Sequence, residues 1–349
     1  FMAGANMQHA LLAGEQYFPY TFQLRQSFTN VLPQAMFNYK FGQGQNLRLM
    51  YRTATNAPSV TQLQQVADIT NPLLLKTGNP NLVQDYTHNI MLRYGKTNTT
   101  TAHSLFFFTH AGYTNDYIGS ETIIPSNDTI FSDNITIRRG SQLTRPVNLD
   151  GYWNTRSFFT YGLPVNLIKS NLNMHAGFNF RRTPSQINGL INFSNNYAPT
   201  AGFVLGSNIS EKLDFTLSYN GNYNIVRNTL QQQTDNSYYS HLASFRINWL
   251  PQERIVLNTS LDHNMYSGLN QGFNQQFLLW NAYAGYKFLK DRSLEARISV
   301  YDLLNQNRSI SREITDTYLE DSRTRVLTQY FMFSLTYTLR NFKGMDSSR

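Results

Sequence analysis

Apolar and polar residues alternate with a period of two along many segments of this chain. Between Leu213 and Ile225 the odd positions are apolar, aromatic or glycine, and the even positions are Asp, Thr, Ser and Asn. The same alternation returns in residues 278–288, 294–300 and 331–339. Successive side chains of a β-strand point to opposite faces of the sheet. Each of these segments therefore predicts a strand with one apolar face and one polar face.

The pattern as a whole predicts an all-β protein. Thirteen strands are expected near residues 31–41, 46–55, 86–95, 101–115, 145–162, 170–182, 198–208, 213–226, 238–249, 255–266, 276–289, 294–302 and 328–341. A fourteenth strand is expected within the first dozen residues. Most of these segments are long enough for a tilted transmembrane strand, which needs about 9–11 residues.

Short and long connections alternate between the expected strands. Short turns are expected at residues 42–45, 96–100, 210–212, 251–254 and 290–293. Longer loops are expected at residues 56–85, 116–144, 184–197, 227–237, 267–275 and 303–327. Short turns on one rim and long loops on the other are typical of an up-and-down antiparallel β-barrel in an outer membrane.

The chemistry of the two faces favours a membrane over water. Hydrocarbon offers no hydrogen-bond partner to the backbone, so a sheet can cross a bilayer only if its ladder closes on itself and its outer face is apolar. A soluble β-protein is the alternative, but its strands would usually be about 5–6 residues long. Its exposed face would also need more charge. Charged residues make up only 14% of this chain, and aromatic residues make up another 14%.

Composition and spacing remove several other classes. The chain has no cysteine, which excludes a disulfide scaffold, thiolate metal sites and thiol catalysis. The net charge of +8 is spread over single basic residues, a distribution that argues against nucleic-acid binding. The seven histidines show no metal-binding spacing, and no Ser/His/Asp set stands out. We therefore expect no enzymatic activity, no catalytic residues, no cofactor and no metal site.

Two passages carry a more specific signal. Ala57-Pro58-Ser59 and Leu63 are followed by Gly78-Asn79-Pro80-Asn81-Leu82 and by a strand that ends at Tyr94. Residues 300–307 read VYDLLNQN, and the last expected strand ends in an aromatic residue, Phe342. These passages resemble TonB-dependent outer-membrane receptors, and the resemblance spans about residues 31–342. Gln84-Asp85 stands where that family commonly has Pro-Glu, a departure that affects the local turn rather than the register.

The resemblance implies a particular domain organisation. Such receptors are transmembrane antiparallel up-and-down β-barrels of 22 strands with an N-terminal plug domain. This chain supplies about 13–14 strands of that number. We therefore expect residues 1–342 to be the C-terminal portion of the barrel and residues 343–349 a short tail. The plug domain is expected in upstream sequence that this chain lacks, and the expected location is the cell outer membrane.

The resemblance also implies a function, which is active uptake of a scarce nutrient such as a siderophore, a glycan or a peptide. The implied partners are membrane lipid and lipopolysaccharide, the plug domain, the TonB complex and a surface lipoprotein. The long loops become candidates for ligand contact. The candidates for facing the lumen and holding plug carboxylates are Arg48, Arg52, Arg93, Arg246 and Arg297. The alternatives are that these arginines are ordinary lumen residues, and that the barrel is an adhesin, an assembly component or a barrel enzyme.

Overall fold

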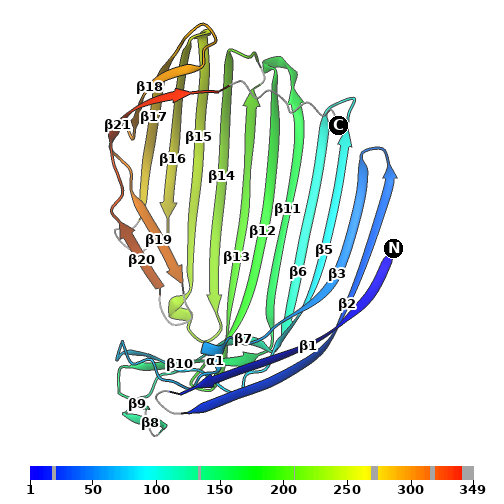
Figure 1. Ribbon diagram of the computed structural model, residues 1–349, viewed down its shortest axis with the longest axis vertical. Coiled ribbons are helices and arrows are strands. Elements are labelled where there is room, and N and C mark those ends of the chain that lie inside the picture. The colour runs from blue at the N-terminus through cyan, green and yellow to red at the C-terminus, as the bar shows by residue number, and fades with distance from the viewer. Residues whose placement is uncertain (18–20, 133–134, 208, 269–273, 315–318, 340–349) are drawn as a thin grey trace, which may run out of the picture.

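The computed structural model describes the chain except for residues 18–20, 133–134, 208, 269–273, 315–318 and 340–349. The expected tail at 343–349 lies outside the described residues. A wall of 14 antiparallel strands dominates the described part (Figure 1). These strands are β1 (Met2–Gln16), β2 (Phe22–Gly42), β3 (Gln45–Asn56), β5 (Asp85–Asn98), β6 (His103–Asn115), β11 (Tyr152–Val165), β12 (Ser170–Ile187), β13 (Leu190–Ser207), β14 (Leu213–Asn228), β15 (Asn236–Gln252), β16 (Ile255–Ser267), β17 (Gln275–Phe288), β18 (Leu294–Tyr301) and β21 (Tyr330–Tyr337).

Each wall strand pairs with the wall strand that precedes it along the chain, so the topology is up-and-down. This confirms the predicted all-β antiparallel architecture. Among the described strands, β1 pairs only with β2 and β21 pairs only with β18, so these two strands form the edges of the wall. The short turns lie along one rim and the long connections along the other (Figure 1).

The strand expected at 31–41 begins nine residues earlier, at Phe22. Two other expected boundaries are wrong, and each has a physical cause. The strand expected at 145–162 is two strands, because β10 (Gln142–Leu149) pairs with β7 (Tyr117–Ile123) outside the wall, and the chain turns at Gly151 with φ 93°. The long loop expected at 184–197 is a tight hairpin, because β12 continues to Ile187 and β13 begins at Leu190. This hairpin lies at the long-loop rim, where an amphipathic pattern no longer marks the strands.

The β12–β13 hairpin turns on Asn188 and Gly189, whose φ angles are 48° and 82°. Two consecutive residues with positive φ define the type I′ turn, which matches the twist of a hairpin and favours Asn-Gly. The Asn188 side chain adds two hydrogen bonds: Ile124 N donates to its Oδ1 at 2.7 Å, and its Nδ2 donates to Ile124 O at 3.1 Å. The turn is therefore fixed by conformation and by contact with the neighbouring connection.

Replacing Gly189 by alanine is expected to cost about 1–2 kcal/mol, because an L-residue pays that amount in the left-handed region. No heavy atom lies within 4 Å of the added Cβ, so the cost is purely conformational. Gly206→Ala is the matched control, since its Cβ also meets open space and its φ is not positive. Denaturant unfolding of the full-length protein in lipid vesicles measures both, and equal stabilities for the two variants would contradict the turn assignment.

The strand register assigns every wall residue to one of two faces. Leu49 pairs with Leu92, Leu217 with Phe245, and Ile298 with Phe333. We name the face that carries these residues the apolar face. The opposite side, the polar face, carries the alternate positions, which are rich in Asn, Ser, Thr and Arg. The observed pairing thus keeps the period-two pattern in phase across the whole wall.

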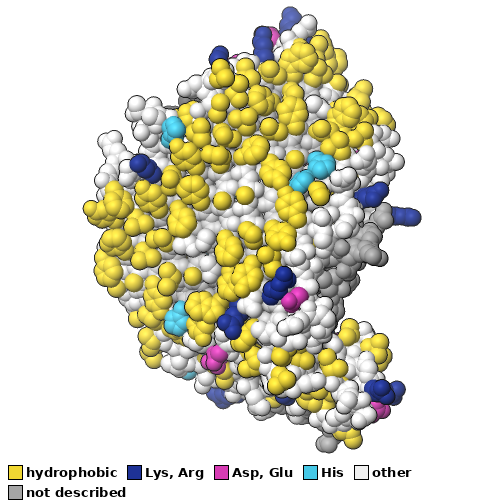
Figure 2. Space-filling model, turned by 180° about the vertical axis from the view of Figure 1, so that it is seen from behind, with side chains coloured by type: hydrophobic (Ala, Val, Ile, Leu, Met, Phe, Trp, Pro, Cys, Tyr) yellow, Lys and Arg dark blue, Asp and Glu magenta, His cyan; other side chains and the backbone are white. Residues whose placement is uncertain are grey.

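The apolar face is not covered by a second layer. Ile298 is 63% exposed, Phe331 70% and Phe333 68%. Figure 2, which views the molecule from the side opposite to Figure 1, shows hydrophobic side chains spread over much of this surface. Apolar side chains exposed over so large an area are expected only where the surrounding solvent is lipid or a large partner.

Aromatic residues mark the two borders of the apolar face. Tyr94 and Tyr86 lie eight residues apart on β5, and Tyr161 and Trp153 lie eight residues apart on β11. Eight residues cover about 26 Å along a strand. At a tilt of about 40° this spans most of the roughly 25 Å apolar band of an outer-membrane barrel, where aromatic girdles flank the lipid-facing surface.

The buried hydrophobic clusters lie at the long-loop rim, in a substructure that we call the clasp. The clasp consists of residues 57–84 and 116–151, as far as they are described. It contains α1 (Val60–Leu63), β4 (Leu74–Lys76), β7 (Tyr117–Ile123), β8 (Thr129–Ser132), β9 (Ile135–Ile137) and β10. β10 pairs with β7 and, in parallel, with β4, and the end of β12 pairs in parallel with β7. A separate hairpin, β19 (Ser309–Ile314) and β20 (Leu319–Thr324), forms part of the connection between β18 and β21.

Candidate functional site

The register places all five candidate arginines on the polar face. Arg48 pairs directly with Arg93, and Arg52 pairs with Asn89. Arg246 pairs with Ser260, and Arg297 pairs with Gly285. The five residues are distributed along the polar face rather than gathered at one point.

The environments of these arginines differ. Arg297 has a carboxylate partner, since its Nη2 lies 2.7 Å from Glu295 Oε1, and its guanidinium lies 4.0 Å from the centre of the Tyr283 ring. In the part of the chain that the structure describes, no carboxylate oxygen lies within 4.0 Å of Arg48, Arg52, Arg93 or Arg246. The charge of Arg297 is therefore neutralised by Glu295 within the wall, whereas the other four arginines have no carboxylate partner among the described residues and leave positive charge on the polar face.

Two of these arginines, Arg48 and Arg93, lie at a surface depression near the β2–β3 turn. Asn38, Lys40, Asn46, Arg48 and Arg93, on the polar face of β2, β3 and β5, line a cavity of about 360 Å³ together with Tyr39 and Leu47. Sequence reasoning singled out the two arginines but not Lys40. Lys40 does share the alternation phase of Asn38, so the pattern held a signal for its face. Its place beside Arg48 follows only from the β2–β3 register.

The clasp gives a structural role to the motif that carries the family resemblance. Ser59 is the N-cap of α1: its hydroxyl accepts from Gln62 N, and Gln62 Oε1 accepts from Ser59 N, which together form a capping box. Leu63, at the end of this helix, is fully buried against Leu82. The short helix therefore delivers one leucine into the core of the clasp.

Gly78 and Asn79 bring the second half of the motif against the helix. Gly78 N donates to Gln64 O at 3.0 Å, and Asn79 N donates to Gln62 O at 2.7 Å. A Cβ on Gly78 would lie 2.2 Å from Gln64 O, so only glycine fits this approach. Asn79 Nδ2 donates to Pro146 O at 3.0 Å, which joins the two halves of the clasp.

The clasp packs onto the polar face of the wall. Leu24 on β2 belongs to the same buried cluster as Leu63 and Leu82. On the same face of β2, Gln26 Nε2 donates to Pro80 O at 2.9 Å, and Asn30 Nδ2 donates to Gln84 Oε1 at 2.7 Å. The connection at 56–85, expected as a ligand-binding loop, thus contacts the polar face of β2 at the long-loop rim through Leu63, Pro80, Leu82 and Gln84.

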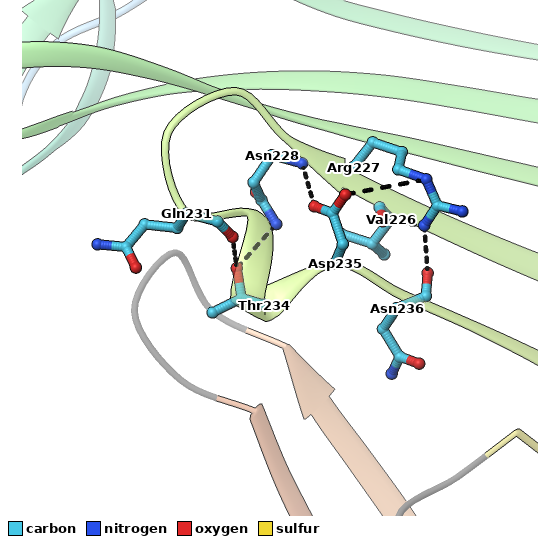
Figure 3. A network of polar contacts seen from close by, with 7 residues as sticks. All are labelled: Val226, Arg227, Asn228, Gln231, Thr234, Asp235 and Asn236. Carbon is cyan, nitrogen blue, oxygen red and sulfur yellow. Dashed lines mark hydrogen bonds and ion pairs between the residues drawn. The ribbon is translucent and has the colours of Figure 1, made fainter.

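The connection between β14 and β15, another expected ligand loop, is tied to itself (Figure 3). Asn228 N donates to Asp235 Oδ1 at 2.7 Å, and the Arg227 guanidinium lies 3.9 Å from the other Asp235 oxygen. Asn228 Nδ2 also donates to Thr234 Oγ1 at 2.9 Å, within the loop that contains η2 (Gln232–Thr234). These polar groups hold the shape of the loop, so its remaining exposed side chains are the ones open to a ligand.

A wide antiparallel wall with one exposed apolar face, two aromatic borders and one polar face defines a transmembrane β-barrel protein of the outer membrane. No helix among the described residues has the length and hydropathy to cross a bilayer. The sequence matches the model of the outer membrane protein beta-barrel family over residues 1–253 and again over 191–337. The chain belongs to this family, and its location is the outer membrane.

Comparison with solved structures adds only loose likenesses. The copper transporter OprC shares 11% identity with a TM-score of 0.41, over 86% of this chain and 46% of OprC. The Pseudomonas putida toluene transporter TodX shares 8% identity with a TM-score of 0.26, over 96% of this chain and 87% of TodX. The chain therefore spans less than half the length of OprC. No curated protein sequence matches this chain. Because both TM-scores are low, the family match carries the assignment.

Proposed function

We propose that this chain is the barrel wall of a TonB-dependent receptor that takes up a scarce nutrient across the outer membrane. The observation that carries the proposal is the clasp. The residues of the receptor-like motif build it, and they fold it over the polar face at the long-loop rim. A barrel that served only to hold a protein in the membrane would not need a folded structure such as the clasp at its long-loop rim.

The proposed mechanism assigns a task to each part of the wall. The apolar face contacts lipid and lipopolysaccharide, and the polar face encloses a hydrated lumen. A plug domain from upstream sequence fills the lumen, and the polar-face arginines Arg48, Arg52, Arg93 and Arg246 hold its carboxylates. The nutrient is captured at the clasp side, with or without a surface lipoprotein. The TonB complex then pulls on the plug to open a path.

The proposal is tested by measuring whether nutrient uptake by cells depends on this gene and on energy from the inner membrane. Cells with and without the full-length gene are supplied with a defined mixture of ferric siderophores, oligosaccharides and short peptides, and depletion of each compound is followed by mass spectrometry. We expect one class of compound to be depleted only when the gene is present. Loss of TonB or addition of a protonophore is expected to reduce that depletion to background.

The opposite result would favour the alternative of an adhesin, an assembly component or a barrel enzyme. That result is depletion that persists without TonB, or depletion profiles that do not differ between the two strains. A control strain carries the full-length gene with Leu167→Ala, a change at a 94% exposed residue of the short connection between β11 and β12 on the rim opposite the clasp, and it is expected to behave like the wild type.

A further inference from the structure

Three cations on the polar face lie together without a counter-charge. Arg48 and Arg93 are direct cross-strand partners, and Lys40 lies on the next strand, two residues beyond the Asn38 that pairs with Arg48. Like charges directly opposite each other in a sheet are destabilising. Among the described residues, no carboxylate oxygen lies within 4.0 Å of any of the three. The electrostatic repulsion among these three positive charges is therefore not offset by an ion pair in the described part of the wall.

The two guanidinium groups are held in place by uncharged neighbours. Arg48 Nε donates to Asn38 Oδ1 at 2.8 Å. The Arg93 guanidinium lies 5.0 Å from the centre of the Phe106 ring, within the range of a cation–π attraction. Arg48 thus donates one N–H to Asn38, and the cation–π contact with Phe106 uses none of the N–H donors of Arg93. A pre-oriented pair of guanidinium groups is suited to bidentate binding of a carboxylate or a phosphate.

The position of this group gives access from the lumen side. The cavity of about 360 Å³ that these residues line lies close to the short β2–β3 turn, and both arginines and Lys40 lie on the polar face. Tyr39 and Phe41, on the apolar face of the same strand, lie at the same height and belong to the aromatic border. The site therefore lies inside the wall at the level of the membrane interface, at the rim opposite the clasp.

We propose that Lys40, Arg48 and Arg93 form a binding site for an oxyanion inside the lumen. The inference rests on the proposed function only in requiring that the polar face encloses a lumen. The oxyanion is either a carboxylate side chain of a polypeptide segment that occupies the lumen or a carboxylate or phosphate group of a free solute. In both cases the oxygens accept hydrogen bonds from the two guanidinium groups, and the Lys40 ammonium adds a third charge. The bound anion removes the repulsion between Arg48 and Arg93.

Equilibrium binding to the full-length protein in detergent tests the free-solute source. Calorimetry with citrate and with inorganic phosphate as probes is carried out at low ionic strength, because salt screens such contacts. If a solute is the ligand, the Arg48→Gln/Arg93→Gln variant is expected to bind about tenfold more weakly or worse, as expected for lost hydrogen bonds to a charged group. Arg156→Gln/Arg181→Gln removes two polar-face charges outside the cavity and is the matched control, with affinity expected to be unchanged.

Zero-length cross-linking tests the polypeptide source. A water-soluble carbodiimide joins a lysine amine to a carboxylate in direct contact, and Lys40 supplies the only amine among the cavity-lining residues. If a polypeptide is the ligand, mass spectrometry of the treated full-length protein in membranes is expected to find Lys40 linked to an Asp or Glu outside the wall. The Arg48→Gln/Arg93→Gln variant is expected to lose that link, whereas the Arg156→Gln/Arg181→Gln variant keeps it.

A link at Lys40 without probe binding supports the site with a polypeptide ligand, and probe binding without a link supports it with a solute. The proposal is overturned if neither occurs, or if Arg156→Gln/Arg181→Gln has the same effect as Arg48→Gln/Arg93→Gln. Electrophoretic mobility of unheated samples confirms that each variant has folded as a barrel. Neither probe binding nor cross-linking needs TonB or an energised membrane. The oxyanion site can therefore be refuted while TonB-dependent uptake is observed, and uptake can be absent while the site is confirmed.

Discussion

Replacing Leu217 by arginine is expected to destabilise the protein in a bilayer by about 2–4 kcal/mol, the cost of a cation on the lipid face near the membrane midplane. Leu217 is 38% exposed on the apolar face, and its cross-strand partners are Leu205 and Phe245. An arginine there has no polar partner across the strands, so it must be transferred into hydrocarbon or reach along the surface to the interface.

Ser218→Arg provides the control from the adjacent residue. Ser218 faces the polar side, where its partner Ser244 pairs in turn with Asp262. An arginine at this position enters a polar environment, and its effect is expected to stay within about 0.5 kcal/mol. Reversible denaturant unfolding of the full-length protein in phospholipid vesicles compares the two variants. Equal destabilisation, or a larger effect for Ser218→Arg, would show that the apolar face does not contact lipid.

Replacing Leu63 by alanine is expected to remove about 2–5 kcal/mol from the stability of the clasp, the usual cost of truncating a buried leucine. Leu63 has no exposed surface and packs with Leu24 and Leu82, which join the clasp to the polar face of β2. Because the clasp contributes little to the pairing of the wall strands, the barrel is expected to remain folded. The clasp is expected to open locally and become accessible.

Hydrogen exchange and limited proteolysis of the full-length protein in membranes measure this opening. We expect faster exchange and new cleavage within residues 57–84, with unchanged exchange in β12 to β16. Leu73→Ala removes the same atoms from a residue that is 60% exposed in the same connection, and its pattern is expected to match that of the wild type. Unchanged protection in the Leu63→Ala protein would mean that the clasp does not depend on this core.

The sequence alone was sufficient to predict the wall. Alternation such as that of residues 213–225 is a local property, because each side chain is assigned to a face by the one before it. The strand count and the alternation of connection lengths follow from that pattern, and the structure confirms both in their main features. The motif from Ala57 to Leu82 was expected only as part of a long loop, and its capping box and the close approach of Gly78 to Gln64 come from the structure.

Only the tertiary structure decided the register in which neighbouring strands pair, and therefore which charges meet. Arg48 and Arg93 are 45 positions apart in the chain, and their pairing depends on where the clasp lets β5 rejoin β3. Lys40 joins them through a hairpin register, and the burial of Leu63 depends on Leu24 of a distant strand. Alternation specifies a face but not a neighbour. Contacts between faces are set by hydrogen bonding and packing across the whole sheet, which no local pattern contains.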